Sequence, residues 1–205
     1  MEEKLNAVTH GVGAGLAVLA LVALLVSVHA AGDIWCVTSA VMYGVSLVVL
    51  YLASTLYHSF SGRRVKQVFQ IIDHSAIYVL IAGTYTPFLL ILLRGTLGWI
   101  MFGVIWGLAV VGILFKTVFT QRFEILSTVG YLLMGWLIVF LGKPLVMALP
   151  TPGLIWLVAG GLLYSLGSVF YLARRLPFHH AIWHLFVIAG SAAHFVTVYF
   201  YVLPD

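Results

Sequence analysis

The stretch Arg174-Arg-Leu-Pro-Phe-His-His-Ala-Ile-Trp-His-Leu-Phe-Val-Ile-Ala-Gly190 places a basic, proline-containing loop directly before an apolar segment. Proline interrupts helices because it lacks a backbone N–H, whereas the apolar residues after it continue far enough to cross a bilayer. His180 and His184 stand at the start of this segment, and helix positions i and i+4 lie on the same face. Such a pair of imidazoles can hold one metal ion. Histidines at a membrane interface, with their polar tips in water, would show the same spacing.

The composition is that of an integral membrane protein. Hydrophobic residues make up 63% of the 205 positions and charged residues only 8%, whereas soluble domains carry about 25% charged residues. The formal charge of +4 therefore has to be interpreted by position, and it does not indicate nucleic-acid binding. Cys36 is the single cysteine, which excludes an intrachain disulfide and a Cys-x-x-Cys metal motif. Any metal site would have to use histidine and carboxylate side chains.

Hydropathy predicts seven membrane-spanning helices, since a span needs about 20 mostly apolar residues. The expected spans are 8–30, 34–56, 70–93, 97–116, 125–148, 154–173 and 181–203. The connections between them are short and would make successive helices antiparallel. The fold class that we expect is an all-α seven-helix transmembrane bundle that forms a single domain over residues 1–205. The first apolar run is longer than the core of a signal peptide, so we keep it as a span.

Lysine and arginine are distributed unevenly between the two ends of the predicted bundle. Eight of the ten fall at the N-terminal side: Lys4, Arg63, Arg64, Lys66, Lys116, Arg122, Arg174 and Arg175. Arg94 and Lys143 fall at the opposite side. Under the positive-inside rule the N-terminus is then cytoplasmic and the C-terminus exterior. We expect a multi-pass protein of the cell membrane, that is, the inner or plasma membrane.

This topology brings four ionisable residues to one level of the membrane. His58 follows the second span, Asp73 lies near the start of the third, and His180 and His184 open the seventh. A catalytic zinc ion takes three protein ligands and keeps one position open for water. Ionisable residues within a membrane are functional by default, because their burial costs on the order of 2.5–3.5 kcal/mol. The sequence therefore predicts a zinc site near the cytoplasmic face.

Asp73 and Ser54 are the candidate catalytic residues. Asp73 is the one acid inside an apolar segment, and it could hold a water at the metal as ligand or as general base. The alternative is an ion pair with a basic residue between positions 63 and 66 at the membrane surface. Ser54 precedes His58 by one turn. It could steady the bound water or a substrate carbonyl, or it could simply bond its own i−4 carbonyl.

Further polar residues accompany the first, third and seventh spans. Glu3, Asn6 and His10 share one face of the first helix at spacings of three and four. They could support the metal site from outside, although we favour a role in capping or in bundle packing. His194 lies roughly 15 Å deeper than the paired histidines at 1.5 Å per residue, too far to share their ion, and could line a cavity. Pro87 predicts a kink in the third span, beside which a pocket for an acyl chain could form.

Four groups of residues carry a resemblance to a known family. They are Glu3-x2-Asn6-x3-His10, Ser54-Thr-Leu-Tyr-His58, Asp73-His-Ser-Ala-Ile-Tyr78 with Ala82-Gly-Thr-Tyr-Thr-Pro-Phe88, and His180-Ala-Ile-Trp-His-Leu-Phe-Val187 with His194. Over essentially the whole chain, they resemble the hemolysin III branch of the progestin and adipoQ receptor (PAQR) family. The resemblance implies a seven-helix fold with a cytoplasmic N-terminus and a zinc ion near the cytoplasmic face. It also implies His58, His180 and His184 as ligands, with Asp73 contacting the ion through water and Ser54 nearby.

The function that we expect is zinc-dependent hydrolysis of an amide or ester bond in a membrane lipid, which contributes to membrane homeostasis. Eukaryotic members of the resembled family, and the similar alkaline ceramidases, are associated with hydrolysis of ceramide, and the bacterial branch with lysis and membrane homeostasis. A pore-forming cytolysin is the first alternative, although a conduction path usually shows polar residues through the bilayer. A membrane sensor with a structural zinc is the second, although such sites are normally closed by four protein ligands.

Overall fold

The structure, a computed structural model, describes residues 1–29, 33–119 and 122–204, and the regular elements in these ranges are all helical. The α-helices are α1 (Glu2–His29), α2 (Ile34–Ser59), α3 (Arg63–Pro87), α4 (Thr96–Phe119), α5 (Glu124–Trp136), α6 (Gly142–Ala148), α7 (Thr151–Leu172) and α8 (His179–Tyr201). The π-helical η1 (Phe88–Leu92) continues α3, and the 3-10 helix η2 (Leu137–Leu141) joins α5 to α6. Ala30, the expected end of the first span, lies outside the described residues.

Seven helical stretches in the described ranges are long and apolar enough to cross a membrane. In this count α3 with η1 forms one stretch, and α5 with η2 and α6 forms another. The prediction of an all-α seven-helix membrane bundle is therefore confirmed.

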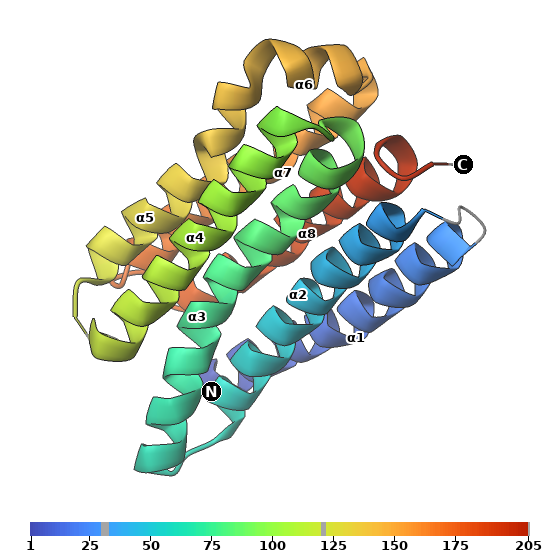
Figure 1. Ribbon diagram of the computed structural model, residues 1–205. Coiled ribbons are helices and arrows are strands. Elements are labelled where there is room, and N and C mark those ends of the chain that lie inside the picture. The colour runs from blue at the N-terminus through green and yellow to red at the C-terminus, as the bar shows by residue number, and fades with distance from the viewer. Residues whose placement is uncertain (30–32, 120–121, 205) are drawn as a thin grey trace.

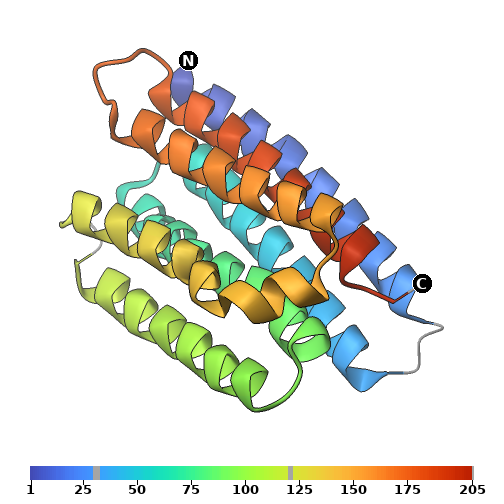
Figure 2. The same ribbon diagram turned by 90° about the horizontal axis from the view of Figure 1, so that it is seen from above.

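The helices form a ring with one helix outside it. α1 packs along α2, α2 along α3, and α7 along α8, which also contacts α1. Figure 2 shows α7, α8 and α1 side by side, with α2, α3 and α5 in a second layer and α4 beyond them. α4 packs on α3 (Figure 1). α5 makes few close contacts with α3 and α7, so the side of the ring that it forms is loosely packed.

The two ends of the chain lie at opposite ends of the bundle (Figure 1). α1 and α8 run parallel, and the Asn6 carbonyl near the start of α1 meets His184 near the start of α8. Ion pairs mark the two ends: Glu3–Lys66 and Glu124–Arg174 at the N-terminal end, and Asp33–Arg94 at the other. A chain that crosses the membrane seven times has its termini on opposite sides, as this arrangement requires.

Apolar side chains cover the outside of the bundle, as expected for a surface that faces lipid. Leu19 on α1, for example, is 67% exposed. Several hydroxyl side chains are buried inside instead, and in the absence of water each needs an internal partner. Ser46 donates to the Tyr43 carbonyl at 2.6 Å and Thr86 to the Ala82 carbonyl at 2.9 Å. These two hydroxyls are in this way satisfied by their own helices.

α3 begins at Arg63, whereas the third span was expected to start at Gln70. The segment 63–69 reads Arg-Arg-Val-Lys-Gln-Val-Phe, which lacks glycine and proline and is rich in helix-forming Arg, Lys and Gln. Its charged residues end the apolar run, which is why hydropathy placed the start of the span later. Charged residues do not prevent helix formation outside the bilayer. The first turns of α3 project beyond the start of α1 in Figure 1.

At Pro87, where a kink was expected in the third span, the structure has a π-helical turn. Pro87 is the last residue of α3, and η1 follows without a break. Within η1 the backbone N–H of Leu93 donates to the Phe88 carbonyl at 2.9 Å, which is the i→i+5 pattern of a π-turn. The missing N–H of proline is thus accommodated by a change of helical register.

The fifth span was expected to be continuous over 125–148, but η2 interrupts it. The helix resumes at Gly142 with a φ of 20°, a conformation that glycine adopts without steric cost. An interruption leaves carbonyls without their usual helical partners. The Tyr85 hydroxyl of α3 donates to the carbonyls of Met134 and Gly135, at 3.1 and 2.7 Å, so the break is stabilised from within the bundle.

A glycine allows the close approach of α2 and α3. A Cβ atom at Gly83 would overlap the Ser46 side chain and lie 3.1 Å from the Met42 carbonyl oxygen. Small residues at helix contacts are the usual means of close packing in membranes. Gly103 on α4, in contrast, has open space around the same position, which makes it a matched control.

We expect Gly83→Ala to lower the free energy of unfolding by about 1–3 kcal/mol, because it overfills a packed contact. Gly103→Ala should be neutral or stabilising, since alanine is the better helix former. Thermal unfolding of both variants in the same detergent measures the difference. Equal melting temperatures for the two variants would contradict the close α2–α3 contact.

The distribution of basic residues predicts the orientation of this bundle in the membrane. A reporter fused to the C-terminus should be active only as an exterior marker, and one fused before Met1 only as a cytoplasmic marker, because the basic ends stay in the cytoplasm. Paired reporters with opposite compartment requirements measure this at each terminus. A cytoplasmic C-terminus would reverse the orientation and place the N-terminal end of the bundle outside the cell.

Candidate metal centre

Three histidines converge at the N-terminal end of the bundle. His58 lies in the last turn of α2, and His180 and His184 lie in the first turns of α8. Their candidate ligand atoms all lie within 4.8 Å of one another. His58 is 8% exposed and His184 1%, whereas His180 is half-buried. The i, i+4 pair and the histidine from another helix therefore meet, as the predicted topology requires.

Contacts at the Nδ1 atoms fix the rings of two of these histidines. His58 Nδ1 donates a hydrogen bond to Glu3 Oε2 at 2.8 Å. His184 Nδ1 lies 3.2 Å from the Asn6 carbonyl oxygen and 3.0 Å from Thr9 Oγ1. Thr9 Oγ1 donates to the Leu5 and Asn6 carbonyls, so it accepts from the imidazole. Both rings thus carry their proton on Nδ1, which leaves the lone pair of Nε2 available as a ligand.

The Nε2 atom of His58 has no partner of its own. It is buried and makes no hydrogen bond within the described part of the chain, although buried polar atoms are normally paired. Histidines that bind a metal usually donate their other ring N–H to a carboxylate or a backbone carbonyl. Glu3 and the Asn6 carbonyl supply one of each. The arrangement has the form expected of metal-binding imidazoles.

The donor set fits zinc. Zinc binds neutral imidazole nitrogens at about 2.0–2.1 Å in a tetrahedral arrangement, which places two such nitrogens roughly 3.3–3.4 Å apart. The candidate ligand atoms lie within 4.8 Å of one another, so the rings would move inward by up to about 1.5 Å to bind the ion. Imidazole ligands with no thiolate among them suit zinc, as they also suit copper, iron and nickel.

Glu3, Asn6 and His10 are all placed against the histidines by one face of α1. Glu3 joins two partners, because its Oε1 atom also accepts from Lys66 Nζ at 2.9 Å. Asn6 acts through its backbone carbonyl, while its side-chain Oδ1 is buried without a partner in the described residues. The His10 ring stacks on that of His184, with 3.4 Å between centroids and 11° between planes. This face therefore contacts the histidines and also joins α1 to α2, α3 and α8.

Asp73 and Ser54 lie together beside the histidines. Asp73 is 8% exposed and Ser54 1%, and the Ser54 hydroxyl interacts with the Asp73 carboxylate as a hydrogen-bond donor. Within the described ranges, Asp73 forms no ion pair, and Lys66 pairs with Glu3 instead. Asp73 is also not a member of the group whose ligand atoms lie within 4.8 Å of one another. Asp73 therefore stands outside this group of ligand atoms and lines the same cavity as His180 and His184.

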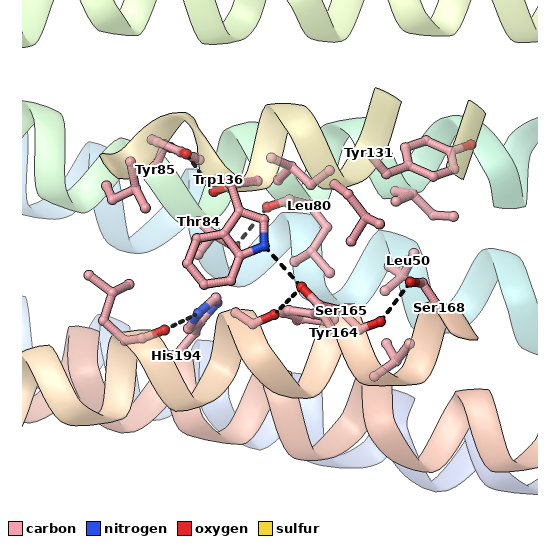
Figure 3. A pocket seen from close by; sticks show the side chains of 18 of the residues that line it. Leu50, Leu80, Thr84, Tyr85, Tyr131, Trp136, Tyr164, Ser165, Ser168 and His194 are labelled. Carbon is pink, nitrogen blue, oxygen red and sulfur yellow. Dashed lines mark hydrogen bonds between the residues drawn. The ribbon is translucent and has the colours of Figure 1, made fainter. Parts of the chain in front are cut away.

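A cavity of about 370 Å³ opens from this end of the bundle toward the other. At one end its wall includes Asp73, Ser54, His180 and His184, and at the other His194. The remaining lining is mostly apolar and aromatic and comes mainly from α2, α3, α5, α6, α7 and α8, with single residues from α1 and η1 and two from η2. Figure 3 shows Trp136 reaching across the cavity, where its indole N–H donates to Ser165 Oγ at 2.9 Å. A volume of this order suits a small organic ligand or one chain of a lipid.

Sequence reasoning gave no role at the site to Thr9, Lys66 or His74. Thr9 lies on the same face as Asn6, but a threonine in a helix is usually bonded to its own turn, so nothing singled it out. Lys66 lay in a segment expected to be a connection. His74 lines the cavity, and its backbone carbonyl accepts from the Tyr131 hydroxyl at 3.0 Å. These contacts depend on the packing of helices that are distant in sequence.

Comparisons with known proteins identify relatives along nearly the whole chain. The model of the family described as "Haemolysin-III related" matches residues 1–195. "Hemolysin-3" of Bacillus cereus is 54% identical over 203 residues, which cover 99% of this chain and 93% of that protein. "Hemolysin-3 homolog" of Bacillus subtilis (strain 168) is 52% identical over 200 residues, 98% of this chain and 94% of that protein.

A more distant relative is found in animals. "Monocyte to macrophage differentiation factor" of Homo sapiens is 32% identical over 209 residues, 98% of this chain and 84% of that protein. A family match over this length, together with the seven membrane-spanning helices, shows that the chain is a multi-pass membrane protein that belongs to the haemolysin-III-related family.

Proposed function

We propose that this protein is a zinc-dependent hydrolase of an amide or ester bond in a membrane lipid, and that it serves membrane homeostasis. One observation carries the proposal: three histidine side chains, two of them held through Nδ1, lie beside a buried carboxylate at the end of a lipid-sized apolar cavity. Three nitrogen ligands with an open position are typical of catalytic zinc. A carboxylate beside them supplies the base that hydrolysis needs.

The residues divide the chemistry between them. Zinc held by His58, His180 and His184 would polarise the scissile carbonyl and activate a water for attack. Asp73 takes the proton of the attacking water, and Ser54 orients the Asp73 carboxylate by donating to it. The water oxygen adds to the carbonyl carbon, and the bond from that carbon to the leaving nitrogen or oxygen breaks when the carbonyl double bond re-forms. Asp73 then delivers its proton to the leaving group, so that an acid and an amine or alcohol result.

The cavity selects the substrate class. Its wall is predominantly hydrocarbon and aromatic, which binds an acyl chain and excludes water from it. The carboxylate and the histidines lie at one end of this wall, where the polar linkage between chain and head group would come to rest. The reaction is thereby directed to an acylated amphiphile that enters from the membrane.

A membrane sensor with a structural zinc is the second candidate. It is favoured by the contacts that join α1, α2 and α8 through Glu3, Asn6 and the histidines, because an ion there would stabilise three helices at once. Lysis, which the names of the bacterial relatives suggest, would instead require a polar path across the membrane. The mostly apolar wall of the cavity does not favour a pore.

We expect about one zinc ion per chain in the purified protein, bound by neutral imidazoles. His58→Ala, His180→Ala and His184→Ala should each release most of it and lower the melting temperature, because each removes one of three ligands. Metal analysis together with thermal unfolding, before and after chelation, measures both effects. His29→Ala is the matched control, since His29 is exposed at the end of α1. Full zinc occupancy in the double variant His180→Ala/His184→Ala would overturn the site.

Asp73→Asn should separate chemistry from metal binding. Asparagine keeps the shape of the side chain but accepts no proton, so zinc should remain while turnover falls by about 10²–10⁴-fold, the usual contribution of a general base. The assay is fatty-acid release from ceramide-like amides and from phospholipid esters in mixed micelles, with His184→Ala as the background.

Two results would count against the hydrolase. The first is a folded, zinc-loaded parent protein that cleaves neither substrate class above the His184→Ala background. The second is an Asp73→Asn variant that loses zinc as completely as the histidine variants. Asp73 would then be a fourth ligand, the site would be closed, and the structural role would be the better account.

A further inference from the structure

The far end of the cavity holds a histidine with one unused nitrogen. His194 on α8 is 9% exposed and lines the cavity. Its Nε2 lies 3.1 Å from the Leu157 carbonyl oxygen, so Nε2 carries the proton and donates it. Its Nδ1 is buried and has no partner among the described residues. Since a charged imidazole would be costly to bury here, the ring is neutral and Nδ1 is a hydrogen-bond acceptor.

The orientation of this ring is fixed by close packing against α7. A Cβ atom at Gly160 would overlap the Cδ2–Nε2 side of the ring, so only glycine leaves room for it there. The ring of Tyr164 lies 5.5 Å away between centroids. Nδ1 lies on the other side of the ring from Gly160, away from the α7 backbone. Figure 3 shows His194 together with Tyr164, Thr84 and Trp136 around this part of the cavity.

The protein's own donors at this end are committed to other acceptors. Thr84 Oγ1 donates to the Leu80 carbonyl and Ser165 Oγ to the Gly161 carbonyl. The indole N–H of Trp136 donates to Ser165, the Tyr85 hydroxyl to α5 carbonyls, and the Tyr164 hydroxyl is bonded to Ser191. None of these groups is hydrogen-bonded to His194 Nδ1, so the donor that Nδ1 lacks is left to a hydroxyl group that enters the cavity.

We propose that the deep end of the cavity is a second binding subsite, in which His194 Nδ1 accepts a hydrogen bond from a hydroxyl group on the lipid chain. This inference rests on the proposed function only in placing the lipid's head group at the three histidines. His184 and His194 stand on one continuous helix, about 15 Å apart at 1.5 Å per residue. The ligand class is thus a long-chain amphiphile with a polar head and a hydroxyl near the far end of its chain.

The test compares laurate, ω-hydroxylaurate and laurate hydroxylated at mid-chain, whose extended chains match this separation. Their affinities for the full-length, zinc-loaded protein in lipid nanodiscs are measured by competition with labelled laurate. ω-Hydroxylaurate should bind about tenfold more tightly than laurate, as one buried hydrogen bond to an unpaired acceptor would give. The mid-chain isomer should bind more weakly than laurate, because its hydroxyl meets the apolar wall.

Two substitutions of His194 distinguish the roles of its two ring nitrogens. His194→Gln keeps an N–H that reaches the Leu157 carbonyl but removes the acceptor at the δ position, so the preference for ω-hydroxylaurate should vanish while laurate affinity stays. His194→Asn keeps an acceptor at the δ position and should retain part of the preference. A preference that survives His194→Gln overturns the subsite.

The series of ligands also decides the matter in the unaltered protein. Equal affinities for laurate and ω-hydroxylaurate would mean that Nδ1 is satisfied without the ligand, and equal gains for both hydroxylated isomers would mean that the hydroxyl acts elsewhere. Either result overturns the proposal even if the His194 variants fail to fold. Because binding is measured and not turnover, the subsite can fail while hydrolysis stands. Asp73→Asn should lose hydrolysis and keep the ω-hydroxyl preference.

Discussion

The need to satisfy buried imidazole nitrogens in the absence of water underlies the N-terminal end of this bundle. Each ring has two nitrogens, and hydrocarbon offers a partner to neither. Glu3 and the Asn6 carbonyl, both on α1, take the N–H groups of His58 on α2 and His184 on α8. The Nε2 atoms thereby keep their lone pairs free. A cation between the rings would satisfy several lone pairs together, which no single donor side chain could do.

The same contacts explain which part of the site could be read from the sequence. The spacing of His180 and His184 and the alternation of span directions place three histidines at one level, because both depend only on helical period and topology. The contribution of Asn6 could not be foreseen, since it comes from a backbone carbonyl that every residue possesses. Thr9 is equally invisible, because its hydroxyl also bonds its own helix. Roles of this kind arise from packing between α1 and α8, which sequence spacing does not encode.

A similar boundary separates the predictable and unpredictable parts of the fold. Long apolar runs identify the spans because a helix needs them to cross a bilayer. Hydropathy cannot predict an interruption of the helix within such a run. The interruption at η2 depends on Tyr85, which lies on another helix. Its hydroxyl donates to carbonyls that have lost their usual partners in the helix. The start of α3 at Arg63 was missed for the opposite reason, since a charged helix outside the membrane has no apolar signal. The cavity lies where α5 makes few close contacts with α3 and α7. This packing is a tertiary property that hydropathy does not predict.

The unequal packing of the two halves of the ring gives the cavity one rigid wall and one looser one. α8 is held along its length by α7 and α1, and it carries both the histidines at one end and His194 at the other. Gly160 brings the α7 backbone against the His194 ring, so that the Nδ1 atom of His194 is held in place by packing. The separation between the two polar ends is then set by helical rise and not by side-chain flexibility. α5, on the facing wall, is interrupted by η2 and makes few close contacts with α3 and α7. A cavity with one closely packed wall would discriminate a ligand by the distance between its polar groups more strictly than by the shape of its hydrocarbon.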